Sequence, residues 1–210
     1  MSLLIRAGEV VLFQGDSITD AGRSYEKNDQ LGQGYANLIA AWFSALYPAM
    51  KVNFINRGIS GNTVEALQRR WQTDCLELKP TLISIMIGIN DCWRRYDSNS
   101  ETSVNKFEKD YRDILTQIKI NLNAKVILCE PFVLPVPEDR KTWREDLDPK
   151  IQIVRNLARE FNTLLIPCDG LFAQACTQRE PDFWANDGVH PSQAGHALLA
   201  QMWLKTVGAI

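Results

Sequence analysis

Short runs of apolar residues alternate along the chain with stretches in which apolar positions recur every three or four residues. The runs at 10–14, 52–56, 81–87, 125–130 and 163–167 have the length and composition of β-strands. Residues 82–87 read LISIMI, and such nearly continuous apolar segments are typical of strands that are covered on both faces. We therefore expect a parallel sheet buried between two layers.

Helical periodicity follows most of these runs. Apolar stripes span residues 35–46, 104–122 and 151–161, and a closing helix is expected at 191–207. Strands alternating with helices predict an α/β fold with right-handed crossovers and helices on both faces of a five-stranded sheet. The chain has 210 residues, so residues 1–210 are predicted to form a single domain. In such sheets ligands bind at the carboxyl ends of the strands, which makes the residues after each strand the candidates for chemistry.

Composition and charge narrow the function classes. The net charge of −2 leaves no basic excess to neutralise a phosphate backbone, so nucleic acid is not an expected partner. No apolar stretch approaches the roughly 18–20 residues of a membrane span, and the N-terminal segment lacks a signal-peptide pattern. We therefore expect no membrane association and a cytoplasmic location.

Five scattered cysteines without a CxxC pair predict free thiols rather than a disulfide framework or a zinc site.

The first strand-like run is followed by the segment GDSITD at 15–20. A serine at a strand-to-helix turn exposes its hydroxyl, and its own N–H lies near the start of the helix. Ser17 could thus act as a nucleophile and also hold an oxyanion. Taken alone, helix capping by Ser, Thr or Asp explains the segment more simply. The segment also lacks the lysine and spacing of a phosphate loop, and Asp16 and Asp20 would repel phosphate.

Two further segments follow the second and third runs. NRGISGNT at 56–63 contains Gly58, which permits close approach of the backbone to a ligand. GIND at 88–91 contains Asn90, whose side-chain NH₂ could donate to a developing oxyanion. For each segment alone, an ordinary turn is the simpler interpretation.

The segment DGVHP at 187–191 places Asp187 three residues before His190. If the turn between them is tight, the carboxylate can reach one ring nitrogen of His190 and leave the other for Ser17. The only other histidine, His196, falls inside the expected closing helix and is better explained as a packing or surface residue. Each of these segments is a weak signal alone, but together they place a nucleophile, oxyanion donors and an Asp/His pair after the strands.

These segments carry a resemblance over about residues 10–204. The chain resembles the GDSL/SGNH hydrolase family of esterases, in the order GDSI at 15–18, Gly58, GIND at 88–91 and the D-x-x-H pattern at 187–190. An isoleucine stands where the family name has leucine, which is a conservative departure. The resemblance implies a three-layer, flavodoxin-like α/β/α fold. It also implies an oxyanion hole formed by the Ser17 and Gly58 N–H groups and the Asn90 side chain.

Within that family, the longer stretches GDSITDAGR, NRGISGNTV and SIMIGINDCWRRYD are most similar to carbohydrate acetylesterases, particularly acetylxylan esterases. The expected function is therefore a serine esterase that removes acetyl groups from sugar hydroxyls. Ser17, His190 and Asp187 would act as the catalytic triad, with no metal or organic cofactor. Its expected partner is a small acyl ester such as an acetylated oligosaccharide.

Several questions stay open in the sequence. Trp93, Arg94 and Trp184 flank the catalytic segments and are candidates for substrate binding, but core packing or an oligomer contact explains the tryptophans equally well. Residues 131–147, the longest expected loop, could be a lid, a contact in a homo-oligomer or surface decoration. Alternative functions are a lysophospholipase or thioesterase acting on longer acyl chains, a non-catalytic ligand-binding domain, and a nucleotide-binding module.

Overall fold

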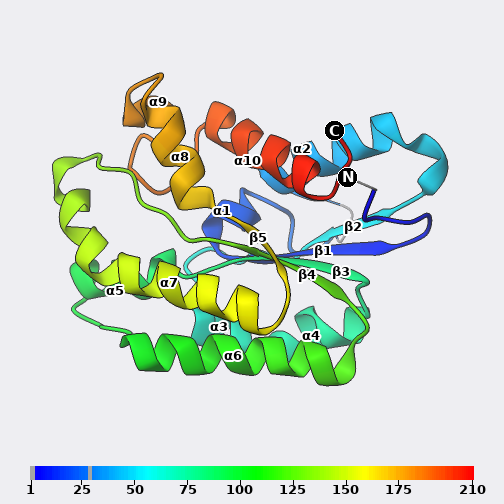
Figure 1. The fold of residues 1–210 in the computed structure, drawn as a ribbon, viewed down its shortest axis with the longest axis horizontal. Helices are drawn as coiled ribbons and strands as arrows, with labels where there is room; N and C mark the ends of the chain where they lie inside the picture. Colours follow the sequence, from blue (N-terminus) through cyan, green and yellow to red (C-terminus); the bar gives the residue numbers. More distant parts are fainter. Residues whose placement is uncertain (1–2, 28–29) are drawn as a thin grey trace.

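The computed structural model describes residues 3–27 and 30–210 (Figure 1). In this part of the chain, five parallel strands form one sheet in the order β2-β1-β3-β4-β5. The strands are β1 (Val10–Gly15), β2 (Asn53–Asn56), β3 (Leu82–Met86), β4 (Lys125–Cys129) and β5 (Leu164–Ile166). The predicted parallel sheet, its five strands and its flavodoxin-like order are confirmed.

Helices cover both faces of the sheet, as the alternating pattern predicts (Figure 1). One layer consists of α1 (Ser17–Asp20), α2 (Tyr35–Leu46), α8 (Cys168–Cys176), α9 (Pro181–Trp184) and α10 (Gln193–Thr206). The other layer consists of α3 (Val64–Arg69), α4 (Trp71–Asp74), α6 (Val104–Asn121) and α7 (Arg144–Glu160), with α5 (Ile89–Asp97) beside α7. Short 3₁₀ helices lie at Pro48–Met50, Leu76–Leu78 and Glu138–Trp143.

Successive residues of the central strands face opposite layers. Val11 and Phe13 of β1 belong to the core beneath α2 and α10, whereas Leu12 between them belongs to the core beneath α3 and α6. Every residue of β3 is buried, including Ser84, whose hydroxyl accepts a hydrogen bond from Trp203 Nε1 at 3.1 Å. The two apolar cores explain why the strands read as nearly continuous apolar runs.

Two predicted boundaries are wrong. The expected loop at 131–147 ends earlier, because a 3₁₀ helix forms at Glu138–Trp143 and α7 begins at Arg144. Trp143 and Leu147 are buried there, so burial of apolar side chains outweighs the prolines and charges that favoured a loop. The closing helix begins at Gln193 rather than at 191, since the Ser192 hydroxyl caps it by accepting from the Gly195 N–H.

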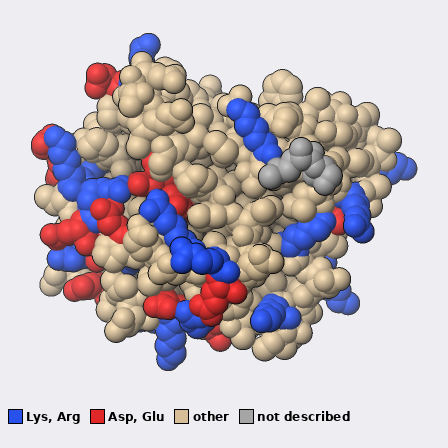
Figure 2. All heavy atoms as spheres, viewed as in Figure 1, with Lys and Arg blue, Asp and Glu red and all other residues tan. Residues whose placement is uncertain are grey.

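Charge is mixed on the surface that Figure 2 shows. Basic and acidic side chains alternate over α5, α6 and α7, and the area over α2 and α10 is largely uncharged. Arg95 pairs with Glu145 at 3.0 Å, and Arg112 pairs with Glu108 at 2.6 Å. The five cysteines are free. Among residues 3–27 and 30–210, no helix has the length and apolar character needed to cross a membrane.

Candidate active site

The strand order brings three candidate segments to one edge of the sheet. Strand β1 lies between β2 and β3, so the segments that follow these strands, at 15–20, 56–63 and 88–91, leave the sheet side by side. Parallel strands all end at the same edge, and the reversal of strand order beside β1 opens a crevice there. The Asp187/His190 segment, which precedes α10, reaches the same edge through contact with Ser17.

Ser17 is the first residue of the short helix α1. The Asp16 carboxylate caps this helix by accepting a hydrogen bond from the Ile18 N–H at 3.0 Å. The N–H of a first helical residue has no acceptor within its own helix, so the Ser17 N–H is available to a ligand. Ser17 is partly exposed, whereas its neighbours Asp16 and Ile18 are buried. The hydroxyl is therefore accessible on a rigid turn.

A chain of hydrogen-bonding distances joins Ser17, His190 and Asp187. Ser17 Oγ lies 2.9 Å from His190 Nε2, and His190 Nδ1 lies 2.6 Å from Asp187 Oδ2. The other oxygen of Asp187 accepts from the N–H groups of Val189 and His190, at 3.0 and 2.7 Å. The Asp187 carboxylate thus closes the turn that carries His190. The same two backbone bonds hold its other oxygen beside the imidazole ring.

Gly188 allows this turn to pack against the rest of the protein. Its φ of +80° lies in the left-handed region, and a Cβ there would come within 2.2 Å of the Val136 carbonyl oxygen. The Leu134 N–H also donates to the Gly188 carbonyl at 2.8 Å. The segment that follows β4 therefore supports the Asp187/His190 turn.

The carboxyl groups near the histidine differ in their electrostatics. Hydrogen bonds from the His190 ring and from two backbone N–H groups outweigh partial burial and hold the pKa of Asp187 below its usual value. The hydrogen bond to Asp187 raises the pKa of His190, and the nearby Asp16 adds to this effect. Burial raises the pKa of Asp16 to about 7 despite the Ile18 N–H bond. The environment thus favours an ionised Asp187 beside a histidine able to accept a proton.

The candidate oxyanion donors are held by other asparagines. Asn90 Nδ2 donates one hydrogen to the Asn62 carbonyl oxygen at 3.1 Å, which orients the amide and leaves its second hydrogen available. The Gly58 N–H donates to Asn56 Oδ1 at 2.8 Å, so an oxyanion would share this hydrogen. A Cβ on Gly58 would lie 2.3 Å from the Asp20 nitrogen, and only glycine permits this approach to α1.

Two of the three candidate substrate-binding residues, Trp93 and Arg94, lie near the candidate triad and the oxyanion donors. The ring centroids of Trp93 and His190 are 5.8 Å apart, which places the indole beside the histidine. The Arg140 guanidinium stacks over Trp93 at 5.3 Å and over Trp143 at 4.0 Å. Arg94 pairs with Asp97, and its Nη2 lies near Gly61 in the segment that follows β2.

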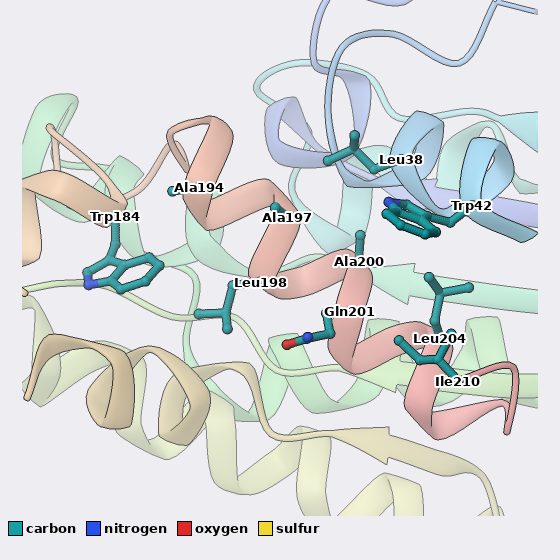
Figure 3. A pocket seen from close by; sticks show the side chains of 10 residues that line it. All are labelled: Leu38, Trp42, Trp184, Ala194, Ala197, Leu198, Ala200, Gln201, Leu204 and Ile210. Atoms are coloured by element: carbon teal, nitrogen blue, oxygen red, sulfur yellow. The ribbon is translucent and has the colours of Figure 1, made fainter. Parts of the chain in front are cut away.

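Trp184 lies elsewhere, at one end of an apolar cavity of about 510 Å³ between α2 and α10 (Figure 3). Leu38 and Trp42 of α2 lie at the other end, and Leu198 lies close to the Trp184 ring. No residue that lines this cavity belongs to the segments at 15–20, 56–63, 88–91 or 187–190. His196 is also separate from Ser17: its Nδ1 accepts from the Tyr35 N–H at 3.2 Å.

Sequence reasoning missed the residues that hold the donors in place. Asn56 and Asn62 lie in the segment at 56–63, in which the sequence points to Gly58 alone. Arg140, which stacks over Trp93 and donates to the Asp187 carbonyl oxygen at 3.3 Å, lies in the region expected to be a loop. Asn56 Nδ2 bonds the Thr19 and Leu31 carbonyl oxygens, at 2.6 and 2.8 Å. The only signal for them in the sequence is their proximity to the candidate segments.

Comparison with known proteins decides the family. Residues 13–198 match the model of the GDSL-like Lipase/Acylhydrolase family. The chain belongs to this family. It is also 36% identical to an acetylxylan esterase from Geobacillus stearothermophilus, over 97% of this chain and 96% of that protein. This GDSL family member is a carboxylic ester hydrolase, as the resemblance implies.

Solved structures of similar proteins have the same fold as this esterase. A protein described as a GDSL-like lipase from Parabacteroides merdae superposes with a TM-score of 0.93 at 36% identity, covering 100% of both chains. The acetylxylan esterase from Geobacillus stearothermophilus superposes with a TM-score of 0.89 at 35% identity, covering 98% of this chain and 97% of that one. The two superpositions cover 98% or more of this chain.

Proposed function

We propose that this esterase hydrolyses acetyl esters of short sugar chains through a Ser17/His190/Asp187 triad. The observation that carries the proposal is the chain of contacts from Ser17 Oγ to His190 Nε2 and from His190 Nδ1 to Asp187, at 2.9 and 2.6 Å. Solved relatives include catalytic mutants of the acetylxylan esterase in which a serine, a histidine or an aspartate is replaced by alanine. These are the three residue types of the candidate triad.

In the proposed reaction, the Ser17 hydroxyl attacks the ester carbonyl while His190 Nε2 accepts its proton. Asp187 holds the Nδ1 hydrogen and stabilises the imidazolium that forms. The tetrahedral intermediate collapses, His190 returns the proton to the leaving sugar oxygen, and an acetyl group remains on Ser17. Water then attacks this acyl-enzyme while His190 accepts its proton, and the second tetrahedral intermediate collapses as His190 returns the proton to Ser17 Oγ and acetate is released.

The negative oxygen of each intermediate would lie among three donors. These are the Ser17 N–H, the second hydrogen of Asn90 Nδ2, and the Gly58 N–H, which is shared with Asn56. Fixed donors of this kind stabilise charge that exists only in the transition state, and removal of one donor typically costs about 10²–10³ in kcat.

Three observations support a short acyl group and a sugar leaving group. The apolar cavity of about 510 Å³ is lined by α2, α10 and their neighbours rather than by residues that flank Ser17, so it offers a long acyl chain no binding site at the nucleophile. One structural relative is an acetyl-xylooligosaccharide esterase, at a TM-score of 0.90 and 34% identity. The Trp93 indole beside His190 supplies an aromatic surface of the kind that contacts sugar rings.

A hydrolysis panel tests the proposal. Nitrophenyl acetate, butyrate and octanoate measure the acyl length limit, and acetylated xylo-oligosaccharides measure acetate release from sugars. We expect kcat/KM to fall from acetyl to octanoyl, because a longer chain clashes where no apolar site receives it and gains none of the roughly 0.8 kcal/mol that burial of each methylene would contribute. A preference for octanoyl, or hydrolysis of lysophospholipid, would favour the lipid-esterase alternative instead.

A further inference from the structure

One guanidinium group contacts two of the three segments that carry candidate oxyanion donors, and it reaches the third, at 88–91, through Asn62. Arg70 lies at the junction of α3 and α4, and its side chain is only 13% exposed. Its Nη2 donates to the Gly15 carbonyl oxygen at 3.1 Å, its Nη1 to the Arg57 carbonyl oxygen at 2.8 Å, and its Nε to Asn62 Oδ1 at 2.8 Å. These acceptors come from the ends of β1 and β2 and from the loop beside Asn90.

Each of these contacts is linked to a donor by a short covalent or hydrogen-bonded path. The Arg57 carbonyl and the Gly58 N–H belong to one planar peptide unit, so a bond to the oxygen fixes the direction of the N–H. Asn62, whose side chain Arg70 holds, offers its own carbonyl oxygen to Asn90 Nδ2 at 3.1 Å. The Gly15 carbonyl ends β1, two residues before Ser17.

The remaining contacts hold the guanidinium itself. Nη1 also lies 3.0 Å from Gln14 Oε1 and 3.0 Å from Asp74 Oδ2, and Gln14 Nε2 donates to the Asp74 carbonyl at 2.6 Å. Gln14 is fully buried within β1. Burial lowers the pKa of Arg70, against the effect of its bond to Asp74. A planar group with five donors can satisfy these acceptors together, whereas the compact ammonium of lysine cannot.

We propose that Arg70 is a positioning residue that aligns the three oxyanion donors from behind. The inference rests on the proposed esterase mechanism and adds to it a residue that touches no substrate atom. Its side chain joins the loops that follow β1 and β2, and it holds Asn62, which in turn orients Asn90. Loss of this support should move the donors relative to the ester carbonyl, and a displacement of about 1 Å can cost on the order of 10² in rate.

The test compares Arg70→Gln and Arg70→Lys with the wild-type enzyme on nitrophenyl acetate. We expect kcat to fall roughly 10²-fold for Arg70→Gln and less for Arg70→Lys, with KM nearly unchanged, because the donors act on the transition state. Arg70→Lys keeps a cation beside Asp74, so it controls for loss of folding caused by an unpaired Asp74. The matched control is Arg69→Gln, since Arg69 is 74% exposed and pairs only with Glu65 among the contacts described. That variant should keep wild-type kcat.

A double-mutant cycle with Asn90→Ala separates positioning from general stability. If Arg70 acts through the donors, Arg70→Gln should cost less in the Asn90→Ala background than in wild type. A lower melting temperature with unchanged kcat per folded enzyme, or costs that multiply independently, would overturn the inference while leaving the esterase mechanism intact. Failure of the wild-type enzyme to hydrolyse any ester in the panel would instead refute the proposed function and this inference with it.

Discussion

Two aspartates next to the same histidine illustrate how environment sets the chemistry of a side chain. Asp187 is 40% exposed and accepts three hydrogen bonds, so its pKa lies below the usual value. Asp16 is fully buried with one bond from Ile18, and its pKa rises to about 7. Only the first therefore suits the role of a permanently charged partner for His190.

The roles of Ser17 and His190 predict strongly non-additive kinetics. Ser17→Ala and His190→Ala should each lower kcat roughly 10⁴-fold or more, because neither residue can begin the reaction without the other. For the same reason the double variant should be hardly slower than either single variant. Steady-state hydrolysis of nitrophenyl acetate, with circular dichroism to verify folding, measures the effect. Retention of a tenth of wild-type activity by Ser17→Ala would exclude Ser17 as the nucleophile.

At the scale of elements, the two histidines of the chain perform different tasks. His196 joins α10 to the start of α2: it accepts from the Tyr35 N–H, and its ring stacks on Tyr35 with centroids 6.4 Å apart. Burial lowers its pKa to about 4, and proximity to His190 acts in the same direction. His190 has a raised pKa because of Asp187. The two rings should therefore affect stability with opposite dependence on pH.

This difference gives a prediction for His196→Asn. The unfolded chain takes up a proton on His196 below about pH 6.5, whereas the folded protein does so only near pH 4, so folding stability is lost as the pH falls through this window. Asparagine keeps an acceptor near the Tyr35 N–H but does not titrate. The loss of stability between pH 7 and pH 5 should thus be smaller in the variant, by about 1–3 kcal/mol, in urea denaturation.

The matched control is His190→Asn, measured under the same conditions. A raised pKa in the folded protein makes protonation of His190 stabilising at low pH, an effect that is lost as the pH rises through the folded value. Its replacement should therefore increase the loss of stability on acidification, in the direction opposite to His196→Asn. Identical shifts in the two variants would contradict the assignment of His196 as a buried, neutral histidine.

The elements also show what the sequence could and could not predict. The periodic stripes predict α2 and α6 nearly to their ends, since their apolar faces lie on the cores. The motif segments predict which residues meet at the edge of the sheet. Helix α5 is not among the helices that the apolar stripes predict. Arg70 was not expected either: its bond to Gly15 spans 55 positions and leaves no local pattern.

At the scale of the whole molecule, ionisable side chains are buried at and near the edge of the sheet that carries the candidate active site. Asp91 is 1% exposed and ties the start of α3 to α5, since its Oδ2 accepts from the Val64 N–H at 3.0 Å. Its Oδ1 is buried without a partner among the described residues. Lys150 of α7 is fully buried too and pairs with Asp146 at 2.5 Å. Two apolar cores must therefore offset the cost of these groups.

Asp91→Asn should reveal that cost through its pH dependence. Burial raises the pKa of Asp91 to about 7, so the folded protein holds a proton that the unfolded chain releases near pH 4. Wild-type stability is therefore lost as the pH rises from about 4 to 7, and a neutral amide that can still accept from Val64 avoids this loss. The unfolding free energy of the variant minus that of wild type should therefore increase between pH 4 and pH 7 and stay constant above pH 7. Urea denaturation across this range measures the difference, with Asp148→Asn on the 52%-exposed side chain of α7 as the control. A difference that does not change with pH would mean that Asp91 is ionised in the folded protein throughout, and that the charge of Lys150 compensates for its burial.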